Sequence, residues 1–264
     1  MREERPHFTD PKQLVCEAFE KSAEHYATER ERTPYFQAQL SIVYSMLAGE
    51  HGRILDIGCA AGGEIPEFLR RGFSVIGIDL SSRMLEFARQ RFAGDREVQF
   101  CRADVERLPF SSQSMDHVVC LGVFEFLQDY SPALKEIHRV LRPGGLAVFA
   151  VPSRISLYNV SDRLVNASVR PLWRALKRTV FRKRPQAPPG PSVHRNRCVP
   201  WKFRAILRRH GLEPERSRYS NYFIYPLDRF PDLHVRVAAA LEPLASIPVL
   251  RYGSSVYLVS TRKK

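Results

Sequence analysis

The stretch that decides the fold is Arg53 to Gly63, with the sequence RILDIGCAAGG. Its first part is a short apolar run that ends in Asp56 and Ile57, and its second part consists of small residues. Small residues let a backbone turn sharply and let a ligand approach it closely. Ile65 and Phe68 then follow with helical spacing, so the stretch predicts a strand, a binding loop and a helix. Open α/β sheets bind nucleotides with this arrangement.

The loop differs from the dinucleotide-binding fingerprint G-x-G-x-x-G. Starting at Asp56, it has the pattern D-x-G-x-A-x-G, with an acid before the first glycine. An acid at this place suits a cationic ligand better than a pyrophosphate. The pattern therefore disfavours a nicotinamide-dependent oxidoreductase.

Two more acids follow later strands. The apolar run from Phe73 to Ile78 ends in Asp79, which comes twenty-three residues after Asp56. At about this distance, an acid at the tip of a second strand holds two ribose hydroxyls. Asp104 closes the short run from Val98 to Cys101. Three acids at three successive strand ends predict a single crevice.

Four segments, in this order and at this spacing, resemble the class I S-adenosylmethionine-dependent methyltransferases. The closest resemblance is to the small-molecule branch that includes ubiquinone and menaquinone biosynthesis enzymes. The segments are LDIGCAAGG, VIGIDLS, CRADVERLPFSSQSMDHVVCLGVFEFLQD and LRPGGLAVFAVP, which together cover about residues 50–152. The resemblance implies a doubly wound α/β fold, with a seven-stranded, mostly parallel, Rossmann-like sheet and two added N-terminal helices. It also implies insertions after strand 5 and between strands 6 and 7.

The same resemblance implies S-adenosylmethionine as the cofactor. It places Asp79 on the ribose hydroxyls and places Leu80 and Met84 beside the adenine. The full set of implied cofactor-binding residues is Asp56, Gly58, Cys59, Ala60, Gly62, Asp79, Leu80, Met84, Asp104, Val105 and Leu121. No metal is expected, because no cluster of His, Cys and Asp has the spacing of metal ligands.

Two residues are candidates for a catalytic role. Tyr26, in FEKSAEHYATER, resembles a tyrosine that roofs the cofactor site in this branch; a half-buried helix aromatic is the alternative. Phe126 stands where the branch often has a histidine, and because Phe126 cannot transfer a proton, a base must come from elsewhere. His194, shortly before a Pro-x-Phe helix start, resembles a histidine that faces the acceptor in related chains; a structural histidine is the alternative.

Length and composition favour one elaborated domain over 264 residues. We expect an N-terminal helical cap (1–50), a cofactor-binding core (51–152), a basic amphipathic insertion (153–199), and a C-terminal part (200–264) with an aromatic insertion (221–253). The five cysteines are scattered without a C-x-x-C pair, which favours a reducing, cytoplasmic location. The first ten residues are charged and no stretch approaches 18 apolar residues, so neither a secretory signal nor a membrane span is expected.

The net charge of +13 is concentrated in one region. Between Pro152 and Arg218 there are seventeen Lys or Arg and three acids, whereas the rest of the chain has 24 basic and 25 acidic residues. Apolar residues recur every three to four positions among these cations. A basic amphipathic helix of this kind can lie on an anionic membrane surface through 155–184, giving a peripheral membrane location. It can also serve as a lid over the site, or bind RNA.

The sequence therefore predicts an S-adenosylmethionine-dependent methyltransferase that acts on a small, lipophilic acceptor, with O-methylation favoured. Two alternatives stay open. One is an RNA (tRNA) methyltransferase that uses the basic insertion, and the other is a catalytically silent protein that only binds the cofactor. The identity of the acceptor and the oligomeric state are left open.

Overall fold

The computed structural model describes residues 11–29, 33–161, 196–221, 236–237, 240–241, 243 and 253–264. Two helices precede the sheet, α1 (Pro11–Glu29) and α2 (Pro34–Met46), as the sequence predicts. The strands are β1 (Gly52–Ile57), β2 (Phe73–Asp79), β3 (Val98–Arg102), β4 (Met115–Leu121), β5 (Leu141–Pro152), β6 (Leu212–Ser220) and β7 (Val256–Lys263). The other helices are α3 (Ile65–Arg70), α4 (Ser82–Arg91), the 3-10 turn η2 (Phe124–Phe126), α5 (Ser131–Val140) and α8 (Pro200–Arg209).

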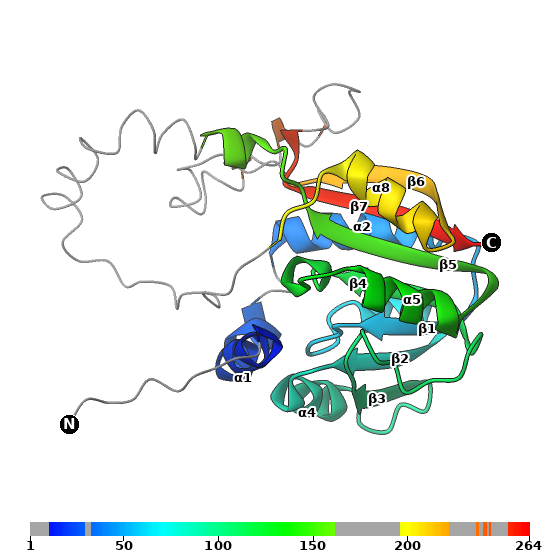
Figure 1. Cartoon of the computed structure of the whole chain (residues 1–264). Helices are drawn as coiled ribbons and strands as arrows, with labels where there is room; N and C mark the ends of the chain where they lie inside the picture. Colours follow the sequence, from blue (N-terminus) through cyan, green and yellow to red (C-terminus); the bar gives the residue numbers. More distant parts are fainter. Residues whose placement is uncertain are drawn as a thin grey trace, which may run out of the picture.

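The seven strands form one sheet in the order β3-β2-β1-β4-β5-β7-β6 (Figure 1). The five strands from β1 to β5 pair in parallel, and β7 runs antiparallel to both β5 and β6. This confirms the predicted doubly wound, mostly parallel fold. Most of the two predicted insertions, including residues 162–195 and 222–235, lies outside the described residues.

Helices cover both faces of the sheet because successive strand residues point to opposite sides. In β4, Val118 and Cys120 join one buried cluster, while Val119 and Leu121 join the other. The first cluster includes the apolar side chains of α5 and α8, and the second includes those of α2 and α3. The central strands are therefore buried on both faces, as is usual for parallel sheets.

Two element boundaries differ from what their local sequence predicts. A Ser-Pro pair predicts serine as the N-cap of a helix, but α5 begins at Ser131 and Tyr130 is the cap; the Ser131 N–H donates to Asp129 Oδ1 at 2.9 Å. The apolar run from Leu146 to Val151 predicts a strand over those residues, whereas β5 begins at Leu141. It begins early because Leu141 already pairs with β4, before an irregularity in the register.

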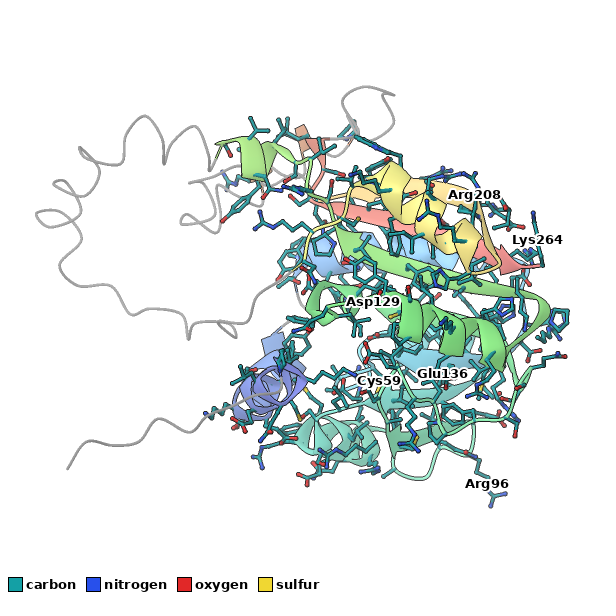
Figure 2. All side chains as sticks on the ribbon, viewed as in Figure 1. Cys59, Arg96, Asp129, Glu136, Arg208 and Lys264 are labelled. Atoms are coloured by element: carbon teal, nitrogen blue, oxygen red, sulfur yellow. The ribbon has the colours of Figure 1, made fainter. Side chains whose placement is uncertain are left out.

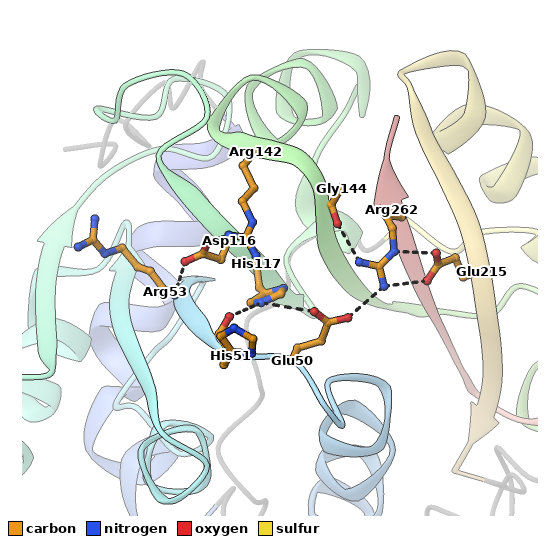
Figure 3. A network of polar contacts seen from close by, with 9 residues as sticks. All are labelled: Glu50, His51, Arg53, Asp116, His117, Arg142, Gly144, Glu215 and Arg262. Atoms are coloured by element: carbon orange, nitrogen blue, oxygen red, sulfur yellow. Dashed lines mark hydrogen bonds and ion pairs between the residues drawn. The ribbon is translucent and has the colours of Figure 1, made fainter.

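A polar network ties the sheet together at the end opposite the glycine loop (Figure 3). Asp116 accepts the Arg53 N–H at 2.6 Å and pairs with Arg142 at 2.6 Å. Arg262 of β7 pairs with Glu50 at 3.0 Å. His117 is buried in this region, with its Nε2 atom 3.0 Å from the His51 carbonyl oxygen. Burial lowers the pKa of His117, so this side chain is neutral in the folded protein near pH 7.

Candidate functional site

The glycine loop begins where β1 leaves the sheet. The N–H groups of Gly58 and Cys59 both donate to the Ile78 carbonyl, at 2.8 and 3.0 Å, and this holds the loop against the end of β2. Gly58 has φ +75°, and a Cβ there would lie 2.3 Å from Val123 Cγ2. Ala60 is also left-handed, with φ +47°. The loop therefore needs glycine at 58 both for its conformation and because Val123, just after β4, packs closely against it.

Asp79 lies at the tip of β2, directly beside this loop. Its Oδ2 accepts the Ala60 N–H at 3.0 Å, and its Oδ1 accepts the Ser81 N–H at 2.8 Å. Burial raises the pKa of Asp79, while these backbone N–H groups act in the opposite direction. Two bonds leave lone pairs unused on a carboxylate, so Asp79 is oriented and can still accept hydroxyl donors.

Asp104 lies in the loop after β3 and forms the next side of the site. Its Oδ1 accepts the Glu106 N–H at 3.0 Å, and its Oδ2 accepts a hydrogen bond from Lys12 Nζ at 2.6 Å. Lys12 also donates to Glu106. A lysine from the first helix, 92 residues away in sequence, therefore reaches the loop that carries Asp104.

A pocket lies among these strand ends and under α1. Nine of the predicted residues line it: Tyr26, Gly58, Ala60, Asp79, Leu80, Met84, Asp104, Val105 and Leu121. Sequence reasoning did not assign the other lining residues to the cofactor site, which are Lys12, Val15, Cys16, Phe19, Ile57, Ile78, Ser81, Ala103, Gly122, Val123, Phe126 and Leu127. Apolar residues such as Val15 and Phe19 recur at helical spacing in α1. This spacing indicates that one face of the helix is buried, but it does not show which part of the protein that face packs against.

Three predicted residues do not line the pocket. Asp56 and Cys59 are completely buried, and Figure 2 shows Cys59 within the body of the molecule while Arg96 projects at its rim. Burial raises the pKa of the Cys59 thiol, so it is protonated. Gly62 lies in the turn itself, where its N–H donates to the Cys59 carbonyl at 2.8 Å. These three residues therefore stabilise the conformation of the loop without lining the pocket.

The remaining wall of the pocket is aromatic and comes from distant segments. Phe19 of α1 makes edge-to-face contacts with Tyr26 (centroids 5.6 Å apart) and with Phe126 of η2 (5.5 Å). Such pairs stabilise the packing of one element on another by about 0.5–1.5 kcal/mol. They hold α1 over the end of β4. The other candidate, His194, lies outside the described residues.

The segment around Asn196 is hydrogen-bonded to the residues that follow β4. The Asn196 N–H donates to the Glu125 carbonyl at 2.6 Å, and the Cys198 N–H donates to the Pro152 carbonyl at 2.9 Å. The chain therefore returns from residues 162–195 directly beside η2, which carries Phe126. This brings the end of the basic region next to the aromatic wall.

The donors and acceptors of the pocket fit S-adenosylmethionine. Asp79 and Asp104 offer carboxylate oxygens to hydroxyl and amino donors, and Gly58 lines the pocket with backbone that carries no side chain. Met84 and Leu80 supply apolar surface for a flat ring. In the described part of the chain, no group of three or more His, Cys, Asp or Glu side chains could hold a metal ion. No described helix is long and apolar enough to cross a membrane.

This sheet order, with strand-tip acids around a glycine loop, defines the class I methyltransferase fold. Residues 55–149 match the family model described as "Methyltransferase domain". Over these residues the chain is similar to S-adenosylmethionine-dependent methyltransferases, and S-adenosylmethionine is the cofactor that such a domain implies.

Two methyltransferases are similar in sequence to part of the chain. The chain is 32% identical over 165 residues to malonyl-[acyl-carrier protein] O-methyltransferase of Enterobacter lignolyticus, covering 62% of this chain and 60% of that protein. It is 32% identical over 119 residues to demethylmenaquinone methyltransferase of Staphylococcus epidermidis, covering 44% of this chain and 49% of that protein. The chain thus spans only about half to three fifths of these relatives.

A solved structure shows the same fold over nearly the whole chain. This is 1,6-didemethyltoxoflavin-N1-methyltransferase of Burkholderia thailandensis, with bound 1,6-didemethyltoxoflavin and S-adenosylhomocysteine. The TM-score is 0.60 at 16% identity, and the match covers 99% of this chain and 93% of that one.

Proposed function

We propose that this protein transfers a methyl group from S-adenosylmethionine to an oxygen atom of a small, lipophilic acceptor. The observation that carries the proposal is the division of the pocket into two unlike sides. One side has the oriented carboxylates of Asp79 and Asp104, and the other has the aromatic wall of Phe19, Tyr26 and Phe126. A polar cofactor and an apolar acceptor would each meet the side that suits them.

The cofactor supplies an electrophilic methyl group on a sulfonium, so the protein has mainly to align the acceptor and exclude water. Asp79 and Asp104 would hold the ribose and the adenine. The aromatic wall would exclude water and orient the acceptor oxygen. A hydroxyl acceptor also needs its proton removed. His194 is the proposed base for that case, with Tyr26 as the second candidate.

Only one of the two relatives is named for methylation of an oxygen. Its name gives O-methylation of a malonyl group on a carrier protein, whereas the other is named for demethylmenaquinone without stating the acceptor atom. For an oxygen acceptor, a carboxylate and a hydroxyl are the two kinds to distinguish. A malonyl carboxylate is already ionised at neutral pH and needs no base, whereas a hydroxyl does. The two kinds of acceptor therefore predict different results for His194→Ala.

The test is a methyl-transfer assay with labelled S-adenosylmethionine and three acceptors: a malonyl thioester, a hydroxylated quinone and unmodified tRNA. Transfer to either small acceptor supports the proposal. With a hydroxyl acceptor, His194→Ala should lower turnover about a hundredfold or more without changing cofactor affinity. With a carboxylate acceptor, it should have little effect. Tight binding of S-adenosylhomocysteine without transfer to any acceptor would favour a silent binding protein.

The second candidate is RNA methylation, which is favoured by the local charge between Pro152 and Arg218. Most of these cations lie outside the described residues, so this candidate rests on the sequence. If the region binds RNA, Arg174→Glu with Lys177→Glu should abolish an RNA gel shift that also weakens steeply with salt. If 155–184 docks on anionic membranes, Leu172→Ala with Trp173→Ala should instead reduce flotation with anionic liposomes. Absence of both kinds of binding would favour a lid.

A further inference from the structure

Lys12 lies in the first turn of α1 and connects this helix to the loop after β3. Its ammonium donates to Asp104 Oδ2 at 2.6 Å and also to Glu106. The three side chains are between 22% and 31% exposed, so the ion pairs are partly shielded from water. Shielding strengthens such pairs relative to fully exposed ones.

Two more contacts fasten α1 along the same side of the pocket. Glu20 Oε1 accepts the Ser82 N–H at 2.7 Å, at the start of α4. The Cys16 thiol lies 3.4 Å from the Leu80 carbonyl oxygen, in the loop after β2. The helix is therefore attached to the two loops that carry Asp79 and Asp104, and Figure 1 shows it beside α4.

The Lys12 bridge brings two carboxylates to a single ammonium. Asp104 and Glu106 are two positions apart, and both side chains point to the same nitrogen. Burial alone would lower the pKa of Lys12, but its hydrogen bonds to Asp104 and Glu106 raise it overall. The ammonium therefore stays charged across the physiological pH range and neutralises one of two like charges that would otherwise repel each other.

The bridge between Lys12 and Asp104 lies at the pocket and therefore affects ligand binding there. Residues of α1, including Val15 and Phe19, line the pocket opposite the strand ends at Gly58 and Leu121. A ligand held between these two walls leaves more slowly when α1 is held firmly. The Phe19–Phe126 ring contact is apolar, whereas Lys12 makes two ion pairs, so salt should act on α1 mainly through Lys12.

We infer that Lys12 is a positioning residue for cofactor retention: by bridging Asp104 and Glu106 it holds α1 over the pocket and sets the rate at which S-adenosylhomocysteine dissociates. The inference rests on the proposed function, since it takes this pocket as the cofactor site. Lys12 would have this role although it contacts Asp104 and Glu106 and not the reacting atoms.

The test compares Lys12→Met, which keeps most of the side-chain length but removes the charge, with the wild-type protein. Stopped-flow displacement should show S-adenosylhomocysteine dissociating about threefold to tenfold faster from Lys12→Met. Raising the salt concentration should speed dissociation from the wild-type protein and have little effect on the variant. In the protein without cofactor, hydrogen exchange of the α1 amides should also be faster in Lys12→Met.

Glu17→Gln is the matched control, because it removes a charge from the same helix at a partly exposed residue that bonds only to Gln13 within the described residues. It should leave dissociation and exchange unchanged. Lys12→Glu places a third carboxylate beside Asp104 and Glu106 and should speed dissociation at least as much as Lys12→Met, and Lys12→Glu with Glu106→Lys should restore slow dissociation by reversing the pair. Equal dissociation and exchange rates for wild type and Lys12→Met would overturn the inference alone. A wild-type protein that binds no S-adenosylhomocysteine would overturn both the inference and the proposed function.

Discussion

The two sides of the pocket are built in different ways. On the cofactor side, Gly58, Ala60 and Asp79 are held by backbone hydrogen bonds and by steric limits within a short stretch of chain. On the aromatic side, which we propose for the acceptor, Phe19 and Phe126 are held by ring contacts between elements more than a hundred residues apart. The side formed by the glycine loop tolerates almost no change in backbone conformation. The aromatic side can exchange its side chains while its helices and strands keep their positions. A family can thus keep one cofactor and vary its acceptors.

The largest effect is expected at Gly58. Gly58→Ala places a Cβ 2.3 Å from Val123 Cγ2 at a residue with φ +75°. Overlap and backbone strain together should lower the free energy of unfolding by about 2–4 kcal/mol, and calorimetry should detect no S-adenosylhomocysteine binding. Gly49→Ala is the control, because Gly49 has φ +83° but no atom within 4 Å of its added Cβ. It should cost only about 1 kcal/mol. Equal effects of the two changes would contradict the role of close packing at Gly58.

The next effect tests the oriented carboxylate. Asp79→Ala should weaken S-adenosylmethionine binding at least tenfold by calorimetry, because each hydrogen bond to a charged group contributes about 1.5–3 kcal/mol. Asp95→Ala is the control, since the Asp95 carboxylate likewise accepts the N–H two residues later, at 2.9 Å from Glu97 N, but outside the pocket. Unchanged affinity in Asp79→Ala would reject this assignment, and tighter binding of NADH than of S-adenosylmethionine would contradict the family's cofactor.

A third change should separate the two sides. Phe126→Ala removes part of the aromatic wall, so turnover on the acceptor found in the assay should fall about tenfold. The glycine loop stays intact and α1 loses only one of its contacts, so the dissociation constant for S-adenosylhomocysteine should rise less than about threefold. Phe87→Ala, at an aromatic of α4 that does not line the pocket, should change neither. Equal losses of cofactor affinity and turnover in Phe126→Ala would mean that the two sides are not separable.

The smallest effect is expected at His117, at the end of the sheet opposite the glycine loop. Burial lowers the pKa of His117 below its ordinary value of 6.5, so the unfolded chain binds a proton there at a pH where the folded protein does not. The free energy of unfolding should therefore fall as the pH falls below 6.5, with a slope of up to about 1.4 kcal/mol per pH unit from this group. His117→Gln should flatten this dependence in urea titrations between pH 7.5 and 5. Parallel pH profiles would show that His117 is not responsible.

Sequence reasoning reached the cofactor side and missed much of the acceptor side for a physical reason. The turn at Gly58 and the acids Asp79 and Asp104 follow strands whose apolar runs are visible in the sequence, and parallel strands place their ends at one edge. Val15, Cys16 and Phe19 carry no such signal, because helical spacing shows that a face is buried without showing its partner. Lys12 was missed because an ion pair across 92 residues leaves no local pattern.

What the sequence by itself determined is the glycine loop with its acids at successive strand ends, since these depend on local propensity and on the general rules of parallel sheets. The seven-stranded sheet followed from the resemblance of four segments to a known family. The tertiary structure alone decided that α1 covers the pocket, that Phe19 meets Phe126, and that Lys12 bridges Asp104 and Glu106. Those contacts depend on how separate elements pack on one another, and packing is a property of the whole chain that no single stretch encodes.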